Sequence, residues 1–131
     1  MNAKYQNLLS EAKKASENSY SPYSSFAVGS AVLSASGRIY LGANVENASY
    51  GLSNCAERSA LFNAFSNGER NVKAAAVWTR KGGVFPCGAC RQVLFELAPS
   101  ADIIINGSDG AILVLKVSDL MPFSFGKENL K

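Results

Sequence analysis

Apolar residues recur every three to four positions near the start of the chain. Between residues 3 and 18 they are Tyr5, Leu8, Leu9, Ala12 and Ala15, and charged residues lie between them. This spacing is typical of an amphipathic helix that turns one face toward a protein core. Residues 19–25 are rich in Ser and contain a Pro, so we expect the helix to end before them in a turn.

The pattern then becomes strand-like. Residues 26–34 and 38–41 predict two strands joined by a tight hairpin at Ser36-Gly37. The next stretch, 44–54, is polar and rich in turn-forming residues, and it is expected to be a loop.

The second half of the chain alternates between helical and strand-like segments. Helical spacing covers 55–67, 72–79 is typical of a buried strand, and a short helix is expected between Cys87 and Pro99. Strands are expected at 103–105 and 111–115, and the tail from Val117 has room for a short helical turn. The order α-β-β-α-β-α-β-β predicts an α/β protein with a mixed sheet of about five strands flanked by helices.

Composition and charge narrow the classes of protein. A chain of 131 residues, 47% apolar and 18% charged, without a repeat or linker, is expected to fold as one domain over 1–131. The net charge of +3 is mild, and the longest basic runs are the pairs Lys13-Lys14 and Arg80-Lys81, so we expect no nucleic-acid partner. No apolar run reaches the roughly 18 residues of a membrane span, and no apolar signal block follows Met1, which predicts a cytosolic protein without a membrane partner.

The chain has three Cys and no His. The absence of His excludes Ser-His-Asp and Cys-His nucleophile systems and every His-ligated metal site. An odd number of Cys in a cytosolic chain argues for metal or thiol chemistry and against a disulfide framework.

All three Cys lie where helices are expected to begin, Cys55 at one helix and Cys87 and Cys90 at another. Helix N-termini stabilise thiolates, which are soft ligands suited to zinc, and a Cys-x-x-Cys pair can bind one ion from a single turn. Three protein ligands leave the fourth place to water, which is the arrangement of a catalytic zinc. Two other interpretations stay open at this point: buried core thiols and a Cys-x-x-Cys redox pair.

Glu57 stands two residues after Cys55. Beside a zinc ion its carboxylate can take a proton from bound water and pass it to a substrate, although alone it would be an ordinary carboxylate in the first turn of a helix. A ligand, one residue, a Glu, and later Pro-Cys-x-x-Cys is the known signature of zinc-dependent nucleobase deaminases, and here it is Cys55-Ala56-Glu57 and Pro86-Cys87-Gly88-Ala89-Cys90.

Four motifs, in order along the chain, resemble those of the small homotetrameric cytidine deaminases. They are SPYSSFAVG at 21–29, NVENASY at 44–50, CAER at 55–58 and PCGACRQ at 86–92. The resemblance implies a cytidine deaminase-like three-layer α/β/α fold. It also implies hydrolytic deamination of cytidine and deoxycytidine to uridine and deoxyuridine in pyrimidine salvage, with release of ammonia. In that reaction a zinc-bound hydroxide attacks C4 of the base, and Glu57 is the proton shuttle.

The same resemblance assigns roles to individual residues. One zinc ion per chain would be held by Cys55, Cys87 and Cys90, and Arg58 and Arg91 would offset the charge of the three thiolates. Phe26 would pack on the pyrimidine, Asn44 and Glu46 would bind the ribose hydroxyl, and the backbone at Ala56 would contact the amine edge. In a homotetramer, neighbouring subunits would add Ala48 and Tyr50 near the ribose and Phe125 against the base.

One position departs from the family pattern, and other functions remain to be separated. Phe85 stands directly before Pro86, where the family often has Ser, so we expect the pocket wall to differ there. The alternatives are a deaminase of an aminonucleoside antibiotic, a nucleic-acid editor, and a zinc-stabilised binding module without catalysis. The intact 44–48 motif disfavours the first, and the lack of a basic groove disfavours the second.

Overall fold

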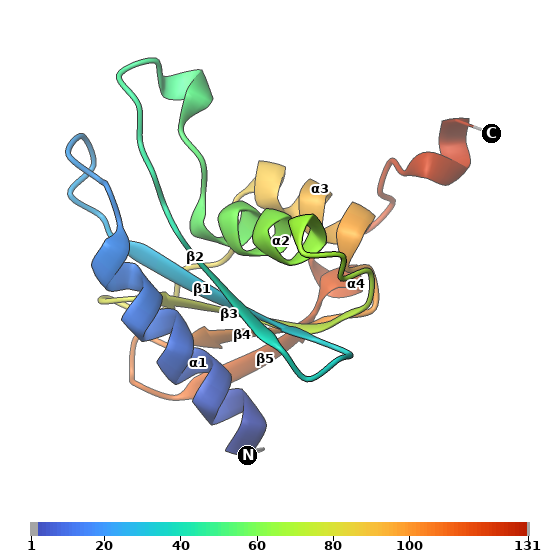
Figure 1. Ribbon diagram of the computed structural model, residues 1–131, viewed down its shortest axis with the longest axis horizontal. Helices are drawn as coiled ribbons and strands as arrows, with labels where there is room; N and C mark the ends of the chain where they lie inside the picture. Colours follow the sequence, from blue (N-terminus) through green and yellow to red (C-terminus); the bar gives the residue numbers. More distant parts are fainter. Residues whose placement is uncertain (1–2, 131) are drawn as a thin grey trace.

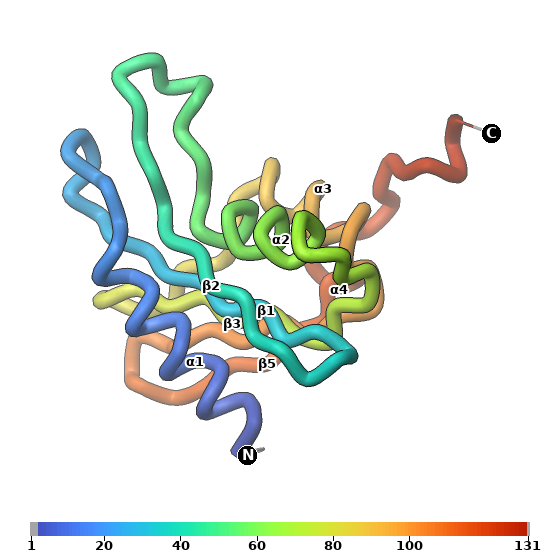
Figure 2. Tube along the Cα trace, viewed as in Figure 1, coloured from blue at the N-terminus to red at the C-terminus, as the bar shows by residue number. Residues whose placement is uncertain are grey.

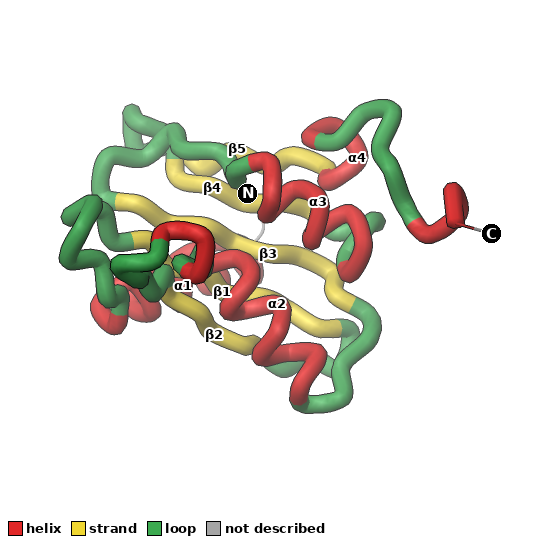
Figure 3. The backbone as a smooth tube through the Cα atoms, turned by 90° about the horizontal axis from the view of Figure 1, so that it is seen from above, coloured by secondary structure: helices red, strands yellow, loops and turns green. Residues whose placement is uncertain are grey.

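A mixed sheet of five strands forms the middle layer of the protein in the computed structural model, which describes residues 3–130 (Figure 1). The strand order is β2-β1-β3-β4-β5 (Figure 3), and β3 and β4 are parallel while the other neighbours are antiparallel. The strands are β1 (Val28–Ser34), β2 (Ile39–Ala43), β3 (Val72–Thr79), β4 (Asp102–Asn106) and β5 (Ile112–Lys116).

Helices cover both faces of this sheet. The helix α1 lies on one face, and α2 and α3 lie side by side on the other (Figures 1 and 3). The α-helices are α1 (Ala3–Ala15), α2 (Ala56–Ser66), α3 (Gly88–Leu97) and α4 (Val117–Leu120), and 3-10 turns cover Ser16–Asn18, Tyr50–Leu52 and Lys127–Leu130. The expected three-layer α/β/α fold is confirmed.

Within the described part of the chain, none of the helices has the length and apolar character that crossing a lipid bilayer requires.

The central strand β3 contributes side chains to two hydrophobic clusters, one on each face of the sheet. Ala74 and Ala76 pack with Leu8 and Ala12 of α1, whereas Ala75 and Val77 face the cluster formed by α2 and α3. Side chains of a strand alternate between faces, so a strand that is apolar at consecutive positions is buried on both sides.

Two glycines let the helices approach the sheet closely. A Cβ atom at Gly29 of β1 would lie 1.9 Å from the Ala12 carbonyl oxygen of α1, and one at Gly42 of β2 would lie 2.3 Å from the Ala60 nitrogen of α2. Any larger residue would push the helix away from the strand. The contact at Gly42 therefore helps to fix α2, whose start carries Cys55.

Some boundaries differ from the expected ones. The first helix ends at Ala15, and residues 16–18 form a 3-10 turn in which the Ser16 hydroxyl bonds to the Lys13 carbonyl. The strand β1 begins at Val28, two residues later than expected, because the Asn44 side chain bonds to the backbone of Phe26 and Val28. The expected loop 44–54 contains a 3-10 turn and rises from the sheet (Figure 2).

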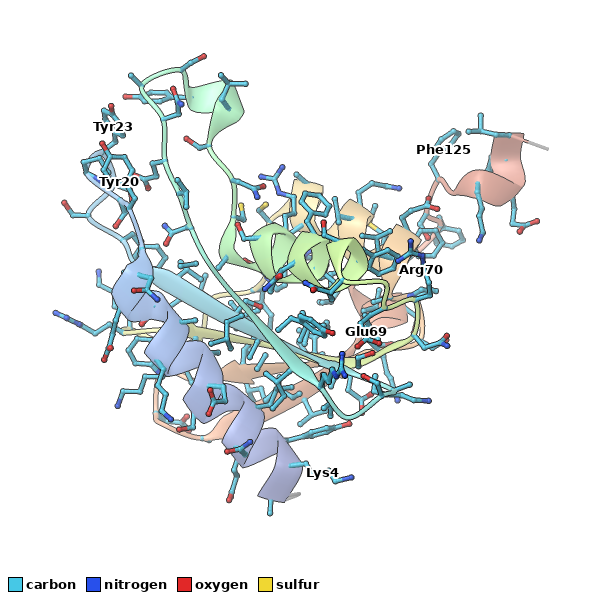
Figure 4. The ribbon with its side chains drawn as sticks, viewed as in Figure 1. Lys4, Tyr20, Tyr23, Glu69, Arg70 and Phe125 are labelled. Carbon is cyan, nitrogen blue, oxygen red and sulfur yellow. The ribbon has the colours of Figure 1, made fainter. Side chains whose placement is uncertain are left out.

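The β1–β2 hairpin is held by one carboxylate. Glu69, which lies just after α2 (Figure 4), accepts hydrogen bonds from the hydroxyls of Ser34, Ser36 and Tyr40 at 2.6 to 2.7 Å. These three bonds, led by the one from Ser34, lower the pKa of the Glu69 carboxyl from 4.5 to about 2.

Glu69→Gln is expected to lower the free energy of unfolding at pH 7, because a neutral amide oxygen accepts weaker hydrogen bonds than a carboxylate. The pKa of Glu69 is lower in the folded protein, so its stabilising effect is present above about pH 4.5 and is lost as the pH falls toward about 2. Denaturant unfolding across this range should show the two proteins converging. Glu96→Gln, at an exposed position of α3, is the matched control, and a difference that stays constant with pH would contradict the assignment.

Candidate active site

The three cysteines meet where two helices begin. Cys55 is the N-cap residue of α2, Cys87 is the N-cap residue of α3, and Cys90 lies in the first turn of α3. Because α2 and α3 pack side by side on one face of the sheet, their N-terminal ends bring together thiols that are 32 or more residues apart in sequence. The predicted position of the cysteines at helix starts is confirmed.

The sulfur atoms have the spacing of a zinc site. All three Sγ atoms lie within 4.8 Å of one another, and those of Cys55 and Cys87 are 3.8 Å apart. Zinc–sulfur bonds of about 2.3 Å in a tetrahedron place sulfurs about 3.8 Å apart. Within residues 3–130 the cluster contains no fourth Cys or carboxylate, so these residues fit a zinc ion that keeps one place for water or substrate.

The surroundings of the thiols favour a thiolate at Cys55. A hydrogen bond from Cys90, assisted by the Arg58 guanidinium, lowers the pKa of Cys55 from 9.0 to about 5. The pKa of Cys90 is raised, first by its hydrogen bond to Cys55 and then by burial. The backbone N–H of Cys90 also donates to Cys87 Sγ at 3.5 Å. These surroundings favour the thiolate form of Cys55, which is the form that binds a metal ion.

The two arginines lie in different places. Arg58 Nη2 donates to Cys55 Sγ at 3.4 Å, and the Arg58 Nε atom is buried without a hydrogen-bond partner. Arg91 donates through Nε to the Pro86 carbonyl at 2.8 Å and through Nη1 to the Leu120 carbonyl at 3.3 Å. Arg58 thus touches a sulfur directly, whereas Arg91 holds the turn that precedes Cys87.

Glu57 lies in the first turn of α2, and the residue is only 5% exposed. Burial, followed by the charge of Cys55, raises the pKa of its carboxyl group above 4.5, so the group takes up a proton more readily than it would in water. The neighbouring Ala56 is fully buried.

Asn44 links the turn at residues 19–25 to the start of β1. Its Oδ1 accepts hydrogen bonds from the Ser19 hydroxyl and from Val28 N at 2.9 Å, and its Nδ2 donates to the Phe26 carbonyl at 2.8 Å. The half-buried Phe26 is thereby fixed between the turn and β1. Within residues 3–130, the bond to the Phe26 carbonyl uses one of the two N–H donors of the Asn44 amide.

Glu46 holds the turn 21–25. Its Oε1 accepts the backbone N–H groups of Tyr23 and Ser24, both at 3.1 Å, and its Oε2 accepts the Ser24 hydroxyl. Between Asn44 and Glu46, Val45 pairs with Asn54 through two backbone hydrogen bonds of 2.9 and 3.0 Å. Because Asn54 directly precedes Cys55, this pairing places the 44–46 segment beside the start of α2.

The structure does not gather every candidate residue in one place. Ala48 and the 76% exposed Tyr50 lie on the raised loop, where the Tyr50 ring meets Tyr23 edge-on at 6.1 Å. Phe125 is 60% exposed on the C-terminal segment, which extends away from the body of the protein and from Tyr23 (Figure 4). Its carbonyl accepts a hydrogen bond from Gln92 Nε2 at 2.9 Å. Phe85 is exposed beside the buried Pro86.

Sequence patterns alone did not reveal the partners of Asn44 and Glu46. Ser19, Tyr23 and Ser24 act through contacts that span 22 to 25 residues, and the chain carries no local spacing that marks them. The only signal was the concentration of Ser between residues 19 and 25.

Comparison with known proteins agrees with this geometry. The sequence profile described as "Cytidine and deoxycytidylate deaminase zinc-binding region" matches residues 2–106, which include all three cysteines. The chain belongs to the cytidine deaminase family. Its Cys55, Cys87 and Cys90 form the zinc-binding cluster of that region.

Relatives and solved structures of the family match nearly the whole chain. Cytidine deaminase of Halalkalibacterium halodurans is 50% identical over 127 residues, covering 95% of this chain and 96% of the relative, and that of Sporosarcina psychrophila is 46% identical, covering 95% and 93%. The crystal structure of cytidine deaminase from Burkholderia pseudomallei has a TM-score of 0.88 at 44% identity, covering 95% of this chain and 100% of the other.

Cys87→Ser is expected to weaken zinc binding by more than about 100-fold, because losing a direct ligand costs more than losing a residue that supports one. Metal analysis after dialysis should find one zinc per chain in the wild type and little in the variant. Phe85→Ala changes the same turn without removing a ligand atom and should keep its zinc. Equal zinc content in the Cys87→Ser and wild-type proteins would contradict the ligand set.

Proposed function

We propose that this protein catalyses the zinc-dependent hydrolytic deamination of cytidine and deoxycytidine to uridine and deoxyuridine, with release of ammonia, in pyrimidine salvage. The observation that carries the proposal is the cluster of three thiols beside the buried carboxyl of Glu57, in a chain 50% identical to a cytidine deaminase.

The chemistry divides between the metal and Glu57. Zinc, when bound by Cys55, Cys87 and Cys90, supplies a Lewis acid that makes water a nucleophile near neutral pH. Glu57 is buried at the start of α2, two residues after a ligand, and it carries the protons. Its carboxylate takes one proton from the attacking water and gives it to N3 of the base as the oxygen adds to C4. It then takes the second proton from that oxygen and gives it to the amino group, which leaves as ammonia as the C4–N bond breaks and the C4=O bond forms.

Free hydrogen-bonding groups support the assignment of ribose contacts. Asn44 retains one N–H, and Glu46 Oε2 retains acceptor capacity beyond its bond with Ser24. A ribose hydroxyl both accepts and donates, so it can bond to the amide and the carboxylate together. Phe26 packs on the pyrimidine, and the backbone at Ala56 contacts the amine edge.

The site is completed by neighbouring subunits of a homotetramer. The candidates Tyr50 and Phe125 are exposed on segments that project from the chain, and Leu52, Phe123 and Leu130 are exposed nearby in sequence. Large apolar side chains grouped on projecting segments favour a protein interface. In this assembly, Ala48 and Tyr50 lie near the ribose and Phe125 against the base, while Arg58 and Arg91 stabilise the metal cluster.

Residues 1–131 act as one domain in the cytoplasm, where thiols stay reduced.

Glu57→Gln is expected to keep one zinc per chain and to lose about 10²- to 10⁴-fold in turnover, the usual loss for a general acid and base. The assay is the fall in ultraviolet absorbance as cytidine becomes uridine. Glu11→Gln, at a half-buried position of α1 where the carboxylate pairs with Lys14, is the control and should match the wild type. An active Glu57→Gln protein would overturn the role of Glu57, and a zinc-loaded wild type without cytidine turnover would overturn the substrate.

Mixing two inactive variants tests whether the site is shared. If Phe125 acts in a neighbour's site, Glu57→Gln chains mixed with Phe125→Ala chains should recover about a quarter of wild-type turnover, the fraction expected for random association. Glu57→Gln mixed with Cys87→Ser is the control, because both lost groups belong to the same chain. Phe125→Ala with wild-type turnover, or no recovery on mixing, would contradict the shared site.

A further inference from the structure

A second charged region lies at the C-terminal end of β3, beside the C-terminal part of α1. The loop after β3, the turn between β4 and β5, and the C-terminal part of α1 run together there (Figures 1 and 2). Two adjoining hollows of about 530 and 440 Å³ share Lys13, Trp78, Arg80 and Lys81, and Glu17 and Phe26 also line the larger one. Each hollow has the volume of a small-molecule site.

The positive charge in these hollows exceeds the negative charge that residues 3–130 place there. Lys13, Arg80 and Lys81 make no ion pair within residues 3–130, and the only carboxylate among the lining residues of either hollow is that of Glu17. Lys13 Nζ lies 5.6 Å from the centre of the Trp78 ring, which holds the ammonium group against an apolar wall. Three cations that share a partly enclosed space attract an anion more strongly than scattered surface charges do.

The loop that carries Arg80 and Lys81 has a fixed backbone. The Thr79 N–H donates to Asn106 Oδ1 at 3.2 Å, and Asn106 Nδ2 donates back to the Thr79 carbonyl at 2.7 Å. Gly82 N donates to Thr79 Oγ1 at 3.0 Å, and a Cβ atom at Gly82, which has φ of +71°, would lie 2.4 Å from the Gly107 carbonyl oxygen. The two cations therefore start from a preorganised turn, which lowers the entropic cost of binding a ligand.

We propose that these hollows bind the phosphate chain of a small phosphorylated ligand, with Lys13, Arg80 and Lys81 as its cationic contacts. A chain of phosphates suits the site because it offers several charged oxygens to cations that come from two different elements. The ligand can be an inorganic polyphosphate or a nucleotide. Trp78 supplies the apolar wall against which the rest of a nucleotide would lie.

Trp78 is the only tryptophan of the chain, so its fluorescence reports on this site. Zinc-loaded full-length protein is titrated with sodium tripolyphosphate, with ATP and with adenosine. Tripolyphosphate and ATP should change the emission in a saturable way that weakens with added salt, and adenosine should leave it unchanged. A Kd for ATP below that of tripolyphosphate assigns the ligand as a nucleotide, and equal values assign the phosphate chain alone.

Substitutions locate the binding. The exposed pair Arg80→Gln/Lys81→Gln should raise the Kd by about tenfold or more, because it removes two charge-assisted contacts. Lys73→Gln, at the opposite end of β3, is the matched control and should bind like the wild type. Absence of saturable binding by both phosphates, an unchanged Kd in the double variant, or an equal response to adenosine would overturn the proposal. Binding is measured without turnover, so this result is independent of the proposed deamination.

Discussion

The zinc cluster depends on the packing of α2 and α3 against the same face of the sheet. Zinc–sulfur bonds are short, so the two helix N-termini must be placed to within a few tenths of an ångström for three thiols to share one ion. Buried alanines, leucines and isoleucines between the helices and the sheet fix this position, and Gly42 lets α2 lie directly against β2. Metal chemistry in this protein is thus a product of its core packing.

Residues 44–46 connect that cluster to the rest of the site. Their middle residue, Val45, pairs with Asn54 just before the first ligand, while the flanking Asn44 and Glu46 bind the turn 19–25 through side-chain hydrogen bonds. One short segment therefore sets the distance between the helix that carries Cys55 and Glu57 and the backbone that carries Phe26. A change at Asn44 would alter both the start of β1 and the position of Phe26.

The order of elements and the positions of the cysteines could be predicted from the sequence, because both depend on local spacing: apolar residues every three to four positions in helices, apolar runs in strands, and thiols at helix starts. The three-layer fold was an expectation from the resemblance to cytidine deaminases. The end of α1 and the start of β1 were misplaced by two or three residues. Those boundaries are set by the side chains of Ser16 and Asn44, which form hydrogen bonds with backbone groups. Residue propensities carry no information about such bonds. The hollow around Trp78 could not be predicted from the sequence, because Lys13 and Arg80 are far apart along the chain and come together only in the fold.

The bonds of Glu46 have a consequence for how the site meets its ligand. Its carboxylate orders the turn at Tyr23 and Ser24, so that turn loses its conformational freedom during folding. In the proposed site, a nucleoside that reached Asn44, Glu46 and Phe26 would meet groups already in place, and little further ordering would oppose its binding. The same bonds make the turn resistant to rearrangement, which would narrow the range of ring and sugar shapes that this side of the proposed site accepts.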